Sequence, residues 1–451
     1  MRTYINTARF MRQYWPLLAG FMTSRLLTQT DLIMLTHVGP DAVAALGVPS
    51  RLMIIDTIAA FCLAPVFSVA ISREELPDAK WRAVRMSLGA AAMASIGLVA
   101  VCMPAYNRLL DRVVTDPHLR PLASVAVNWM TATIPLRLLA FVGSMALFAM
   151  GLGPRIWRIY GVTLAANALL DILLIFKFQM GLSGAYLSTA LVSAIELGWI
   201  LWTLGEAGGR WPFQWPTPSW LRTLSLSLRA EAIRLASWQL EGLLLLSFIA
   251  SRPEWAPRLT AFTVTSEALA VLSMPLIALM RTAAMQIAET LPTGNPGLGW
   301  RALASVRYAA LALCMVAGIG LFVCRAWLGG TLYTTTGESL RWWLGFASIY
   351  AWMLPVLGIA MIARACWQAY EEFRLVAAVE ICIGWLVALP LALSALALGS
   401  AIGFFASLAC REALIAAALL LAMGWHPPNW FNALTRRLHS FSRRPATPPM
   451  E

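Results

Sequence analysis

Two carboxylic acids and an amide lie inside apolar stretches of this sequence, where they could hold a proton or a cation. Asn167 and Asp171 lie in the apolar run 159–176, and Asp31 lies in an earlier apolar run. Residues at positions i and i+4 share one face of a helix. A charged side chain inside a membrane costs roughly 2.5 to 3.5 kcal/mol even on the lenient insertion scale. We therefore interpret these acids first as a functional site.

The composition predicts an all-α polytopic membrane protein. Of 451 residues, 59% are hydrophobic and 12% are charged, and a soluble domain has no interior large enough for that much apolar surface. The formal net charge of +12 is spread over loops and tails, which favours a role in membrane topology over nucleic-acid binding. The seven cysteines mostly stand singly inside apolar runs. Disulfides, a metal site and other cofactors are therefore not expected.

Apolar runs long enough to span a bilayer, divided by charges and Pro/Gly breaks, predict twelve transmembrane helices. They fall near 14–37, 49–72, 83–106, 121–151, 156–177, 182–204, 222–251, 258–290, 302–325, 339–369, 373–397 and 400–424. A long Gly/Pro-rich stretch separates the sixth run from the seventh. The predicted units are an N-terminal six-helix lobe (1–205), a cytoplasmic linker (206–221), a C-terminal six-helix lobe (222–425) and a basic cytoplasmic tail (426–451).

Charge bias and an internal repeat predict how these units are arranged. Lysine and arginine are more frequent in the loops on the side of the N-terminus, which favours two cytoplasmic termini. Trp81–Ala83 recurs as Trp300–Ala302 and Gly184 as Gly403, at an offset of about 219 residues. Each half holds an even number of spans, so the repeats should be related by an axis along the membrane normal. The substrate would then bind between them.

Helix geometry predicts that the acids of the N-terminal half meet at one depth. With the N-terminus inside, the first and fifth helices run outward and the sixth runs inward. Asp31, Asp171 and Thr189 then fall roughly 9 to 10 Å below the outer boundary, with Asn167 one turn deeper. Two close carboxylates cannot both ionise cheaply, so this cluster suits a proton or a cation. The alternative is a buried hydrogen-bond network that only joins helices.

Three stretches resemble the multidrug and toxic compound extrusion (MATE) transporters. The first span carries Pro16, the mid-helix Asp31 and a trailing Ala-Ala-Leu-Gly pattern that ends at Gly47. Asn167–Asp171 is similar to the Asn-x-x-x-Asp helix of the family, and Gly181–Thr189 is similar to the Gly-x-x-Gly-Ala start of the next helix. Further stretches in the eleventh and twelfth spans extend the resemblance over nearly the whole chain.

The resemblance implies twelve transmembrane helices in two pseudo-symmetric six-helix lobes. It assigns Asp31, Asn167, Asp171 and Thr189 to a proton-linked site, and it associates Pro16 with bending of the first helix. The second and eighth helices end differently from the family pattern, which suggests a divergent member with a dedicated substrate. We expect a monomer in the cytoplasmic (inner) membrane of a bacterium, with the lipid bilayer and a small-molecule substrate as its partners and no nucleic acid.

The C-terminal half carries three candidate cavity acids. Glu241 resembles a seventh-helix glutamate that some family members use for cation coupling or substrate binding, but the tenth span lacks the expected aspartate partner. Glu267 and Glu380 face either the central cavity, where they would attract a cationic substrate, or neighbouring helices. The first, second, seventh and eighth helices should line the central cleft, with Glu241 and Glu267 as unpaired acids facing it. No obvious ring of arginines opposes them.

Other polar side chains in the spans have simpler interpretations. Arg137 and Arg364 are expected to be paired or to snorkel rather than to bind substrate. Arg411 can pair with the adjacent Glu412, and neither is assigned a role. Most tryptophans, Trp343 among them, are expected in the interfacial belt.

The sequence therefore predicts an antiporter that exports a cationic or amphipathic small molecule, such as a drug or secondary metabolite, by alternating access. Protons are the expected coupling ion, and sodium is the less favoured one. A lipid-linked oligosaccharide or lipid flippase of the same superfamily is the alternative, although it should line its cavity with arginines. A transport-inactive accessory protein is a third reading. An enzyme is not expected, because the four histidines lie at span ends, in a loop or in the tail and form no catalytic constellation.

Overall fold

The computed structural model describes residues 5–36, 54–113, 119–208, 213–250, 256–291, 294–333 and 335–424, and the regular structure in these ranges is helical. Helices are favoured because every backbone N–H and C=O group must be satisfied within its segment where water is absent. The N-terminal elements are α1 (Thr7–Thr36), α3 (Ile54–Arg73), α4 (Pro77–Val113), α5 (Leu119–Ala132), α6 (Ile134–Ala149), α7 (Gly153–Asp171), the π-helical turn η1 (Ile172–Lys177) and α8 (Gly181–Gly208). The C-terminal elements are α9 (Pro218–Ala250), α10 (Ala256–Thr290), α11 (Pro296–Ala302), α12 (Ala304–Trp327), η3 (Leu328–Leu332), α13 (Gly337–Gln368), α14 (Phe373–Ile383), η4 (Gly384–Ala388), α15 (Leu389–Ala397) and α16 (Ala401–Gly424).

The predicted pattern of spans is present in the structure. Within the described ranges, ten helices are long and apolar enough to cross a membrane, and the pair α5 and α6, bent by 44° at Thr133, makes eleven. Helix α1, which carries Arg25 and Asp31, is not among these and packs against α7 and α10. Helix α8 continues to Gly208 and α9 begins at Pro218, so both helices extend into the predicted linker 206–221.

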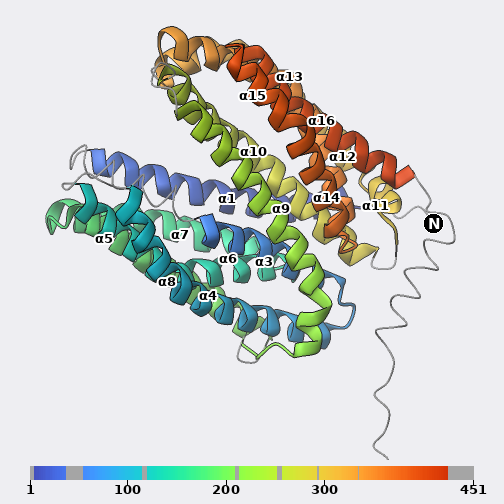
Figure 1. Cartoon of the computed structure of the whole chain (residues 1–451). Coiled ribbons are helices and arrows are strands. Elements are labelled where there is room, and N and C mark those ends of the chain that lie inside the picture. Colours follow the sequence, from blue (N-terminus) through green and yellow to red (C-terminus); the bar gives the residue numbers. More distant parts are fainter. Residues whose placement is uncertain are drawn as a thin grey trace, which may run out of the picture.

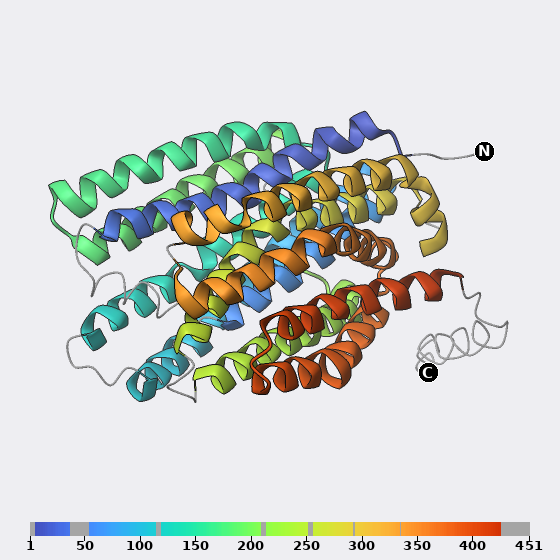
Figure 2. The ribbon, with the colours of Figure 1, turned by 90° about the horizontal axis from the view of Figure 1, so that it is seen from above.

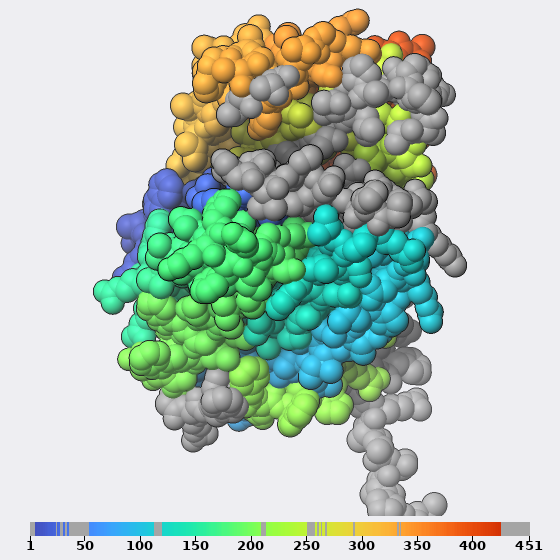
Figure 3. All heavy atoms as spheres, turned by 90° about the vertical axis from the view of Figure 1, so that its left-hand side faces the viewer, coloured from blue at the N-terminus to red at the C-terminus, as the bar shows by residue number. Residues whose placement is uncertain are grey.

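The helices form two lobes that diverge towards one end of the molecule (Figure 1). Seen from above, the helices of the two lobes overlap and most of them run in similar directions (Figure 2). In the N-terminal lobe, α6 packs against α3, α4 and α8, while α1 packs against α7. In the C-terminal lobe, α13 is central and packs against α10, α12 and α16. Helix α9 contacts both lobes, because it packs on α3 and on α14. The view from the diverging end shows the N-terminal lobe below and the C-terminal lobe above (Figure 3).

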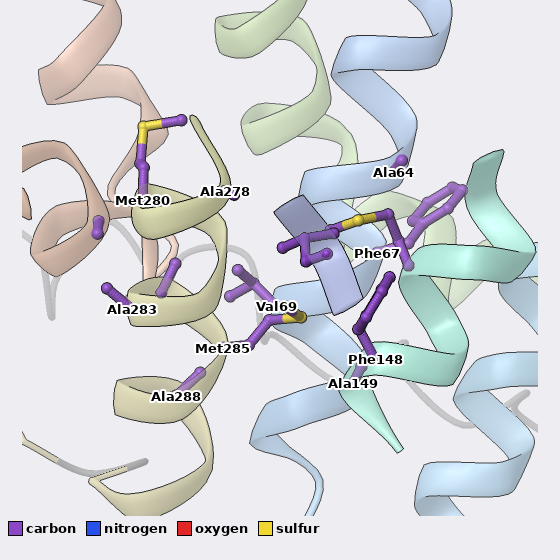
Figure 4. Packing of buried hydrophobic residues seen from close by; sticks show 14 of the residues in the cluster. Ala64, Phe67, Val69, Phe148, Ala149, Ala278, Met280, Ala283, Met285 and Ala288 are labelled. Carbon is purple, nitrogen blue, oxygen red and sulfur yellow. The ribbon is translucent and has the colours of Figure 1, made fainter. Parts of the chain in front are cut away.

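A hydrophobic core joins the two lobes at the end where they converge. Met285 of α10 lies beside Val69 of α3, with Phe67 of α3 and Phe148 of α6 on the far side of that contact (Figure 4). Polar contacts accompany this packing: the Gln286 side chain donates a hydrogen bond of 2.6 Å to that of Gln13 on α1. The lobes are therefore held together near the start of α1 and the ends of α3 and α10.

Close helix packing inside the C-terminal lobe leads to a first testable prediction. A Cβ atom at Gly318 of α12 would lie 2.1 Å from the carbonyl oxygen of Ala351 on α13. Small residues let transmembrane backbones approach closely, so Gly318→Ala forces the two helices apart. We expect a loss of about 1 to 3 kcal/mol in unfolding free energy, measured as earlier unfolding of the purified protein in denaturant.

Gly320→Ala on the same helix is the matched control. No atom lies within 4 Å of a Cβ built at Gly320, and alanine has the higher helix propensity. This variant should unfold like the unmodified protein or slightly later. An equal loss of stability in both variants would contradict the close approach of α12 and α13.

Candidate functional site

The four residues predicted as the N-terminal site meet where α1, α7 and α8 pack together. The side-chain amide of Asn167 donates to Asp31 Oδ1 at 2.9 Å and to Asp171 Oδ2 at 2.8 Å. Thr189 Oγ1 lies 3.2 Å from Asp31 Oδ2 and 3.1 Å from the carbonyl oxygen of Ala185, to either of which it can donate. One amide group therefore bridges two carboxyl groups that come from different helices.

This cluster is buried, and its hydrogen-bond donors are neutral. Asp171 is 0% exposed, Asn167 is 1% exposed and Asp31 is 9% exposed. Among the described residues, Asp171 Oδ1 has no hydrogen-bond partner. The amide and hydroxyl groups donate to the carboxylates but do not neutralise them. A buried carboxylate without a counter-ion is costly, so a proton or a small cation stabilises this arrangement.

The local structure explains how α8 reaches the acids. Helix α7 ends at Asp171 and continues into the π-helical turn η1, a widened turn that often occurs at functional sites. A Cβ atom at Gly184 would lie 2.9 Å from the backbone of Leu174 in η1. The glycine therefore permits the close approach of α8. One turn later, Ser188 and Thr189 face the acid cluster.

Sequence reasoning missed Ser188. Its hydroxyl lies 3.4 Å from the backbone oxygen of Asn167 and 3.5 Å from the side-chain oxygen. These contacts help to orient the amide, so that its NH₂ group faces the acids. The signal for Ser188 was its position next to Thr189 and one turn after Gly184, on the stretch already identified as part of the site.

Pro16 lies far from the acid cluster on the same helix. Helix α1 continues through it from Thr7 to Thr36, and its side chain is buried. A proline inside a helix removes one backbone hydrogen bond, which leaves α1 weaker at this point. Asp31 follows about 22 Å further along the helix axis. Pro16 therefore lies on the part of α1 that contacts the other lobe, close to Gln13.

An ion pair lies elsewhere in the same lobe. Arg137 of α6 binds Asp56 of α3, which confirms that this arginine is paired. Sequence reasoning did not single out Asp56, although it is an acid in the first turn of an apolar helix.

The C-terminal lobe contains a network of buried ion pairs in place of unpaired acids. Its members lie on five helices, namely α9, α10, α13, α14 and α16. They are Arg234, Arg281, Arg364 and Arg411 together with Glu231, Glu241, Glu380 and Glu412. Arg364 joins three helices, since it binds Glu380 at 2.5 Å and Glu412 at 2.7 Å. This confirms the prediction that Arg364 is paired.

Three expectations for this lobe need correction or qualification. Glu241 is not an unpaired acid, because Arg411 binds it at 2.6 Å. The expected local pair of Arg411 with Glu412 is therefore wrong, since Glu412 binds Arg364 instead. Of the two orientations considered for Glu380, the structure shows the one towards neighbouring helices.

Glu380 is held by two arginines from different helices. Arg234 and Arg364 bind the two carboxylate oxygens of Glu380, which is 3% exposed. The four arginines of this network each have a glutamate partner, so their pairing leaves the expectation that no ring of arginines lines the central cavity as a prediction. Glu267 lies on α10, but its side chain is outside the described part of the chain.

The architecture is that of an all-α polytopic membrane protein with a buried polar cluster in its N-terminal lobe. Residues 16–173 match the model of the MatE family. This match covers the N-terminal part of the chain, and the fold of solved MATE transporters extends over most of the rest. No protein of curated function matches the sequence.

Solved structures with the same fold are distant in sequence. An outward-facing multidrug resistance MATE family transporter of the MOP superfamily is 15% identical, with a TM-score of 0.80, and the match covers 92% of this chain and 94% of that one. A MOP superfamily transporter from Pyrococcus furiosus Vc1, for which the reverse polarity of its binding pocket suggests a different function, is 15% identical with a TM-score of 0.81 and the same coverage. A mutant of the Vibrio cholerae MATE transporter VcmN is 16% identical with a TM-score of 0.79, and the match covers 92% of this chain and 96% of that one.

Proposed function

We propose that the protein is a secondary active exporter that exchanges protons for a cationic or amphipathic small molecule. The observation that carries this proposal is the pair of carboxyl groups bridged by Asn167 in the N-terminal lobe. A buried acid pair with neutral donors changes its charge when it gains or loses a proton. Because the two conformations of an alternating-access transporter expose such a pair differently, proton binding can shift their populations.

Helix α1 offers a physical route from the proton site to the contact between the lobes. It carries Asp31 near one end and Gln13 near the other, and Gln13 accepts a hydrogen bond from Gln286 of α10. Arg9 of α1 also binds Glu289 of α10 at 2.9 Å. Protonation of the acids changes how α1 packs on α7, and Pro16 is the point at which α1 can bend. A rearrangement of α1 then alters the contacts that hold the lobes together.

The orientation that we propose makes the diverging end of the lobes the outer side. Both termini then lie in the cytoplasm of a bacterium, and the chain crosses its inner membrane as a monomer. The fold match to an outward-facing MATE transporter supports this choice. In this conformation, protons from outside reach the acids of the N-terminal lobe, neutralise them and release a cationic substrate outward.

The ion pairs of the C-terminal lobe favour protons over sodium as the coupling ion. Glu241 is the acid in this lobe that resembles a cation ligand of the family, and the Arg411 guanidinium already serves as its counter-ion. A sodium ion would have to displace that guanidinium from a buried carboxylate, which costs the pairing energy of both groups. The N-terminal acids have no such built-in cation among the groups that donate hydrogen bonds to them.

The same ion pairs argue against a lipid-linked oligosaccharide flippase. A cavity for a polyanionic headgroup needs arginines whose charge is available. The four arginines of this network lie within 4.0 Å of glutamate oxygens, so much of their charge is compensated. This observation favours the exporter over the flippase.

Transport in proteoliposomes under separate ion gradients tests the proposal. We expect a fluorescent monovalent organic cation to move against its gradient when a pH gradient is imposed, and to stay at equilibrium with a sodium gradient alone. The physical reason is that protonation, and not sodium, neutralises the acid pair. Transport that is driven by sodium at uniform pH would contradict the proton assignment.

A further inference from the structure

A groove between α9 and α14 lies on the outside of the C-terminal lobe, away from the acid cluster. Its volume is about 240 Å³, and six residues from the two helices line it: Leu226, Arg229, Ala230, Ile233, Arg374 and Ala377. The lining combines two cations with four apolar side chains. Neither arginine takes part in the buried ion-pair network or in the proposed transport cycle.

Contacts next to the groove place it at the boundary between membrane and water. Ser227 of α9 donates a hydrogen bond of 3.3 Å to the backbone oxygen of Glu371, in the turn that joins α13 to α14. Glu371 also binds Arg73 at the end of α3. A turn between two spans that carries such charges lies outside the hydrocarbon layer. Arg229 and Arg374 follow within one turn of helix, at the depth of lipid headgroups.

The groove has a polar end and an apolar end. Arg229 and Arg374 are both exposed, whereas Ala230 and Ala377 are buried and form its floor. Ile233 lies one turn further into the membrane than Arg229 and is 60% exposed. Two guanidinium groups on different helices can hold one phosphate group from both sides.

An exposed apolar side of α9 continues the apolar end of the groove. Leu226, Ile233 and Leu240 recur every seven residues, on one face of the helix, and are 50%, 60% and 51% exposed. Below the groove, Arg234 of α9 binds Glu380 of α14 at 2.8 Å. This buried bridge fixes the spacing of the two helices, so the groove is a preformed feature.

We propose that this groove binds an anionic phospholipid, with its phosphate between Arg229 and Arg374 and an acyl chain along Ile233 and Leu240. Basic pockets between transmembrane helices at headgroup depth are suited to anionic lipids. A free phosphate ion would use the arginines only. The apolar stripe that continues from them along α9 favours a molecule with both a charged head and a hydrocarbon tail.

Native mass spectrometry of the full-length protein with defined lipids tests this proposal. The purified protein is incubated with equal amounts of phosphatidylglycerol and phosphatidylcholine, and the bound lipids are counted. We expect a preference for phosphatidylglycerol that falls roughly fivefold for each arginine removed, and about 25-fold in the double variant Arg229→Gln/Arg374→Gln. An unchanged preference in the double variant would overturn the proposal.

Two further measurements separate this site from a general charge effect and from a phosphate site. The control double variant Arg158→Gln/Arg301→Gln removes the same charge from exposed positions outside the groove, and it should keep the full preference. An equal loss in this control would refute a specific site. Millimolar inorganic phosphate should leave phosphatidylglycerol bound, and its displacement by phosphate would show that the arginines bind free phosphate instead. The thermal unfolding of the variants in phosphatidylcholine should match that of the unmodified protein.

Discussion

Asp171→Asn is expected to abolish proton-driven export while the protein still folds and inserts into the membrane. The substitution keeps the shape of the side chain, and the new side-chain oxygen can still accept the hydrogen bond that Asn167 now gives to Asp171 Oδ2. It removes a group that can bind and release a proton. Transport of an organic cation by proteoliposomes under a pH gradient, at matched protein content, measures the effect.

Asp111→Asn is the matched control for this prediction. Asp111 belongs to the same lobe but forms an exposed ion pair with Arg120, and exposed pairs contribute little. This variant should transport like the unmodified protein. Normal export by Asp171→Asn at normal expression would show that the acid cluster has only a structural role.

Asp31→Asn should also abolish proton-driven export, because Asn167 bridges Asp31 and Asp171 and makes the two acids one unit.

The N-terminal site could be predicted from the sequence because the positions of its residues follow from spacing within single helices. The four-residue spacing puts Asn167 and Asp171 on one face of α7, and counting residues from the span ends gives the depth of Asp31 on α1. What remains undetermined is which faces of α1, α7 and α8 contact one another. The finer arrangement could not be predicted, since the bridging by one amide and the contact with Ser188 depend on the π-helical turn after Asp171.

The C-terminal network shows where sequence reasoning fails. Arg411 and Glu412 are neighbours in sequence, but adjacent residues on a helix point in different directions and do not face each other. Arg411 therefore reaches Glu241 on α9, while Glu412 reaches Arg364 on α13. Which acid meets which arginine depends on the packing of five helices. The composition and spacing of the sequence do not predict that packing.

Trp343 makes the same point for an apolar side chain. Its position near the end of a predicted span suggested the interfacial belt, but the structure buries it in the core of the C-terminal lobe. Burial is possible because its indole N–H donates a hydrogen bond of 2.7 Å to the backbone oxygen of Arg325. Run length predicted where most of the long helices lie, whereas it did not predict which faces of those helices are buried.

Arg411→Met is expected to destabilise the protein by about 3 to 5 kcal/mol, because it leaves Glu241 buried without a counter-ion. Both side chains of this pair are at most 10% exposed. Methionine fills a similar volume, so the loss reflects charge and not a cavity. Unfolding of the purified protein in denaturant measures the difference.

The double variant Arg411→Met/Glu241→Gln separates this effect from general damage to the helix. It removes both charges, so most of the lost stability should return, as expected for two groups whose contributions are coupled. If the double variant is as unstable as the sum of the two single changes, the pair does not exist in the membrane. Export by the stable double variant under a pH gradient would also show that Glu241 is not needed for proton coupling. The acids bridged by Asn167 would then be the site that binds the proton.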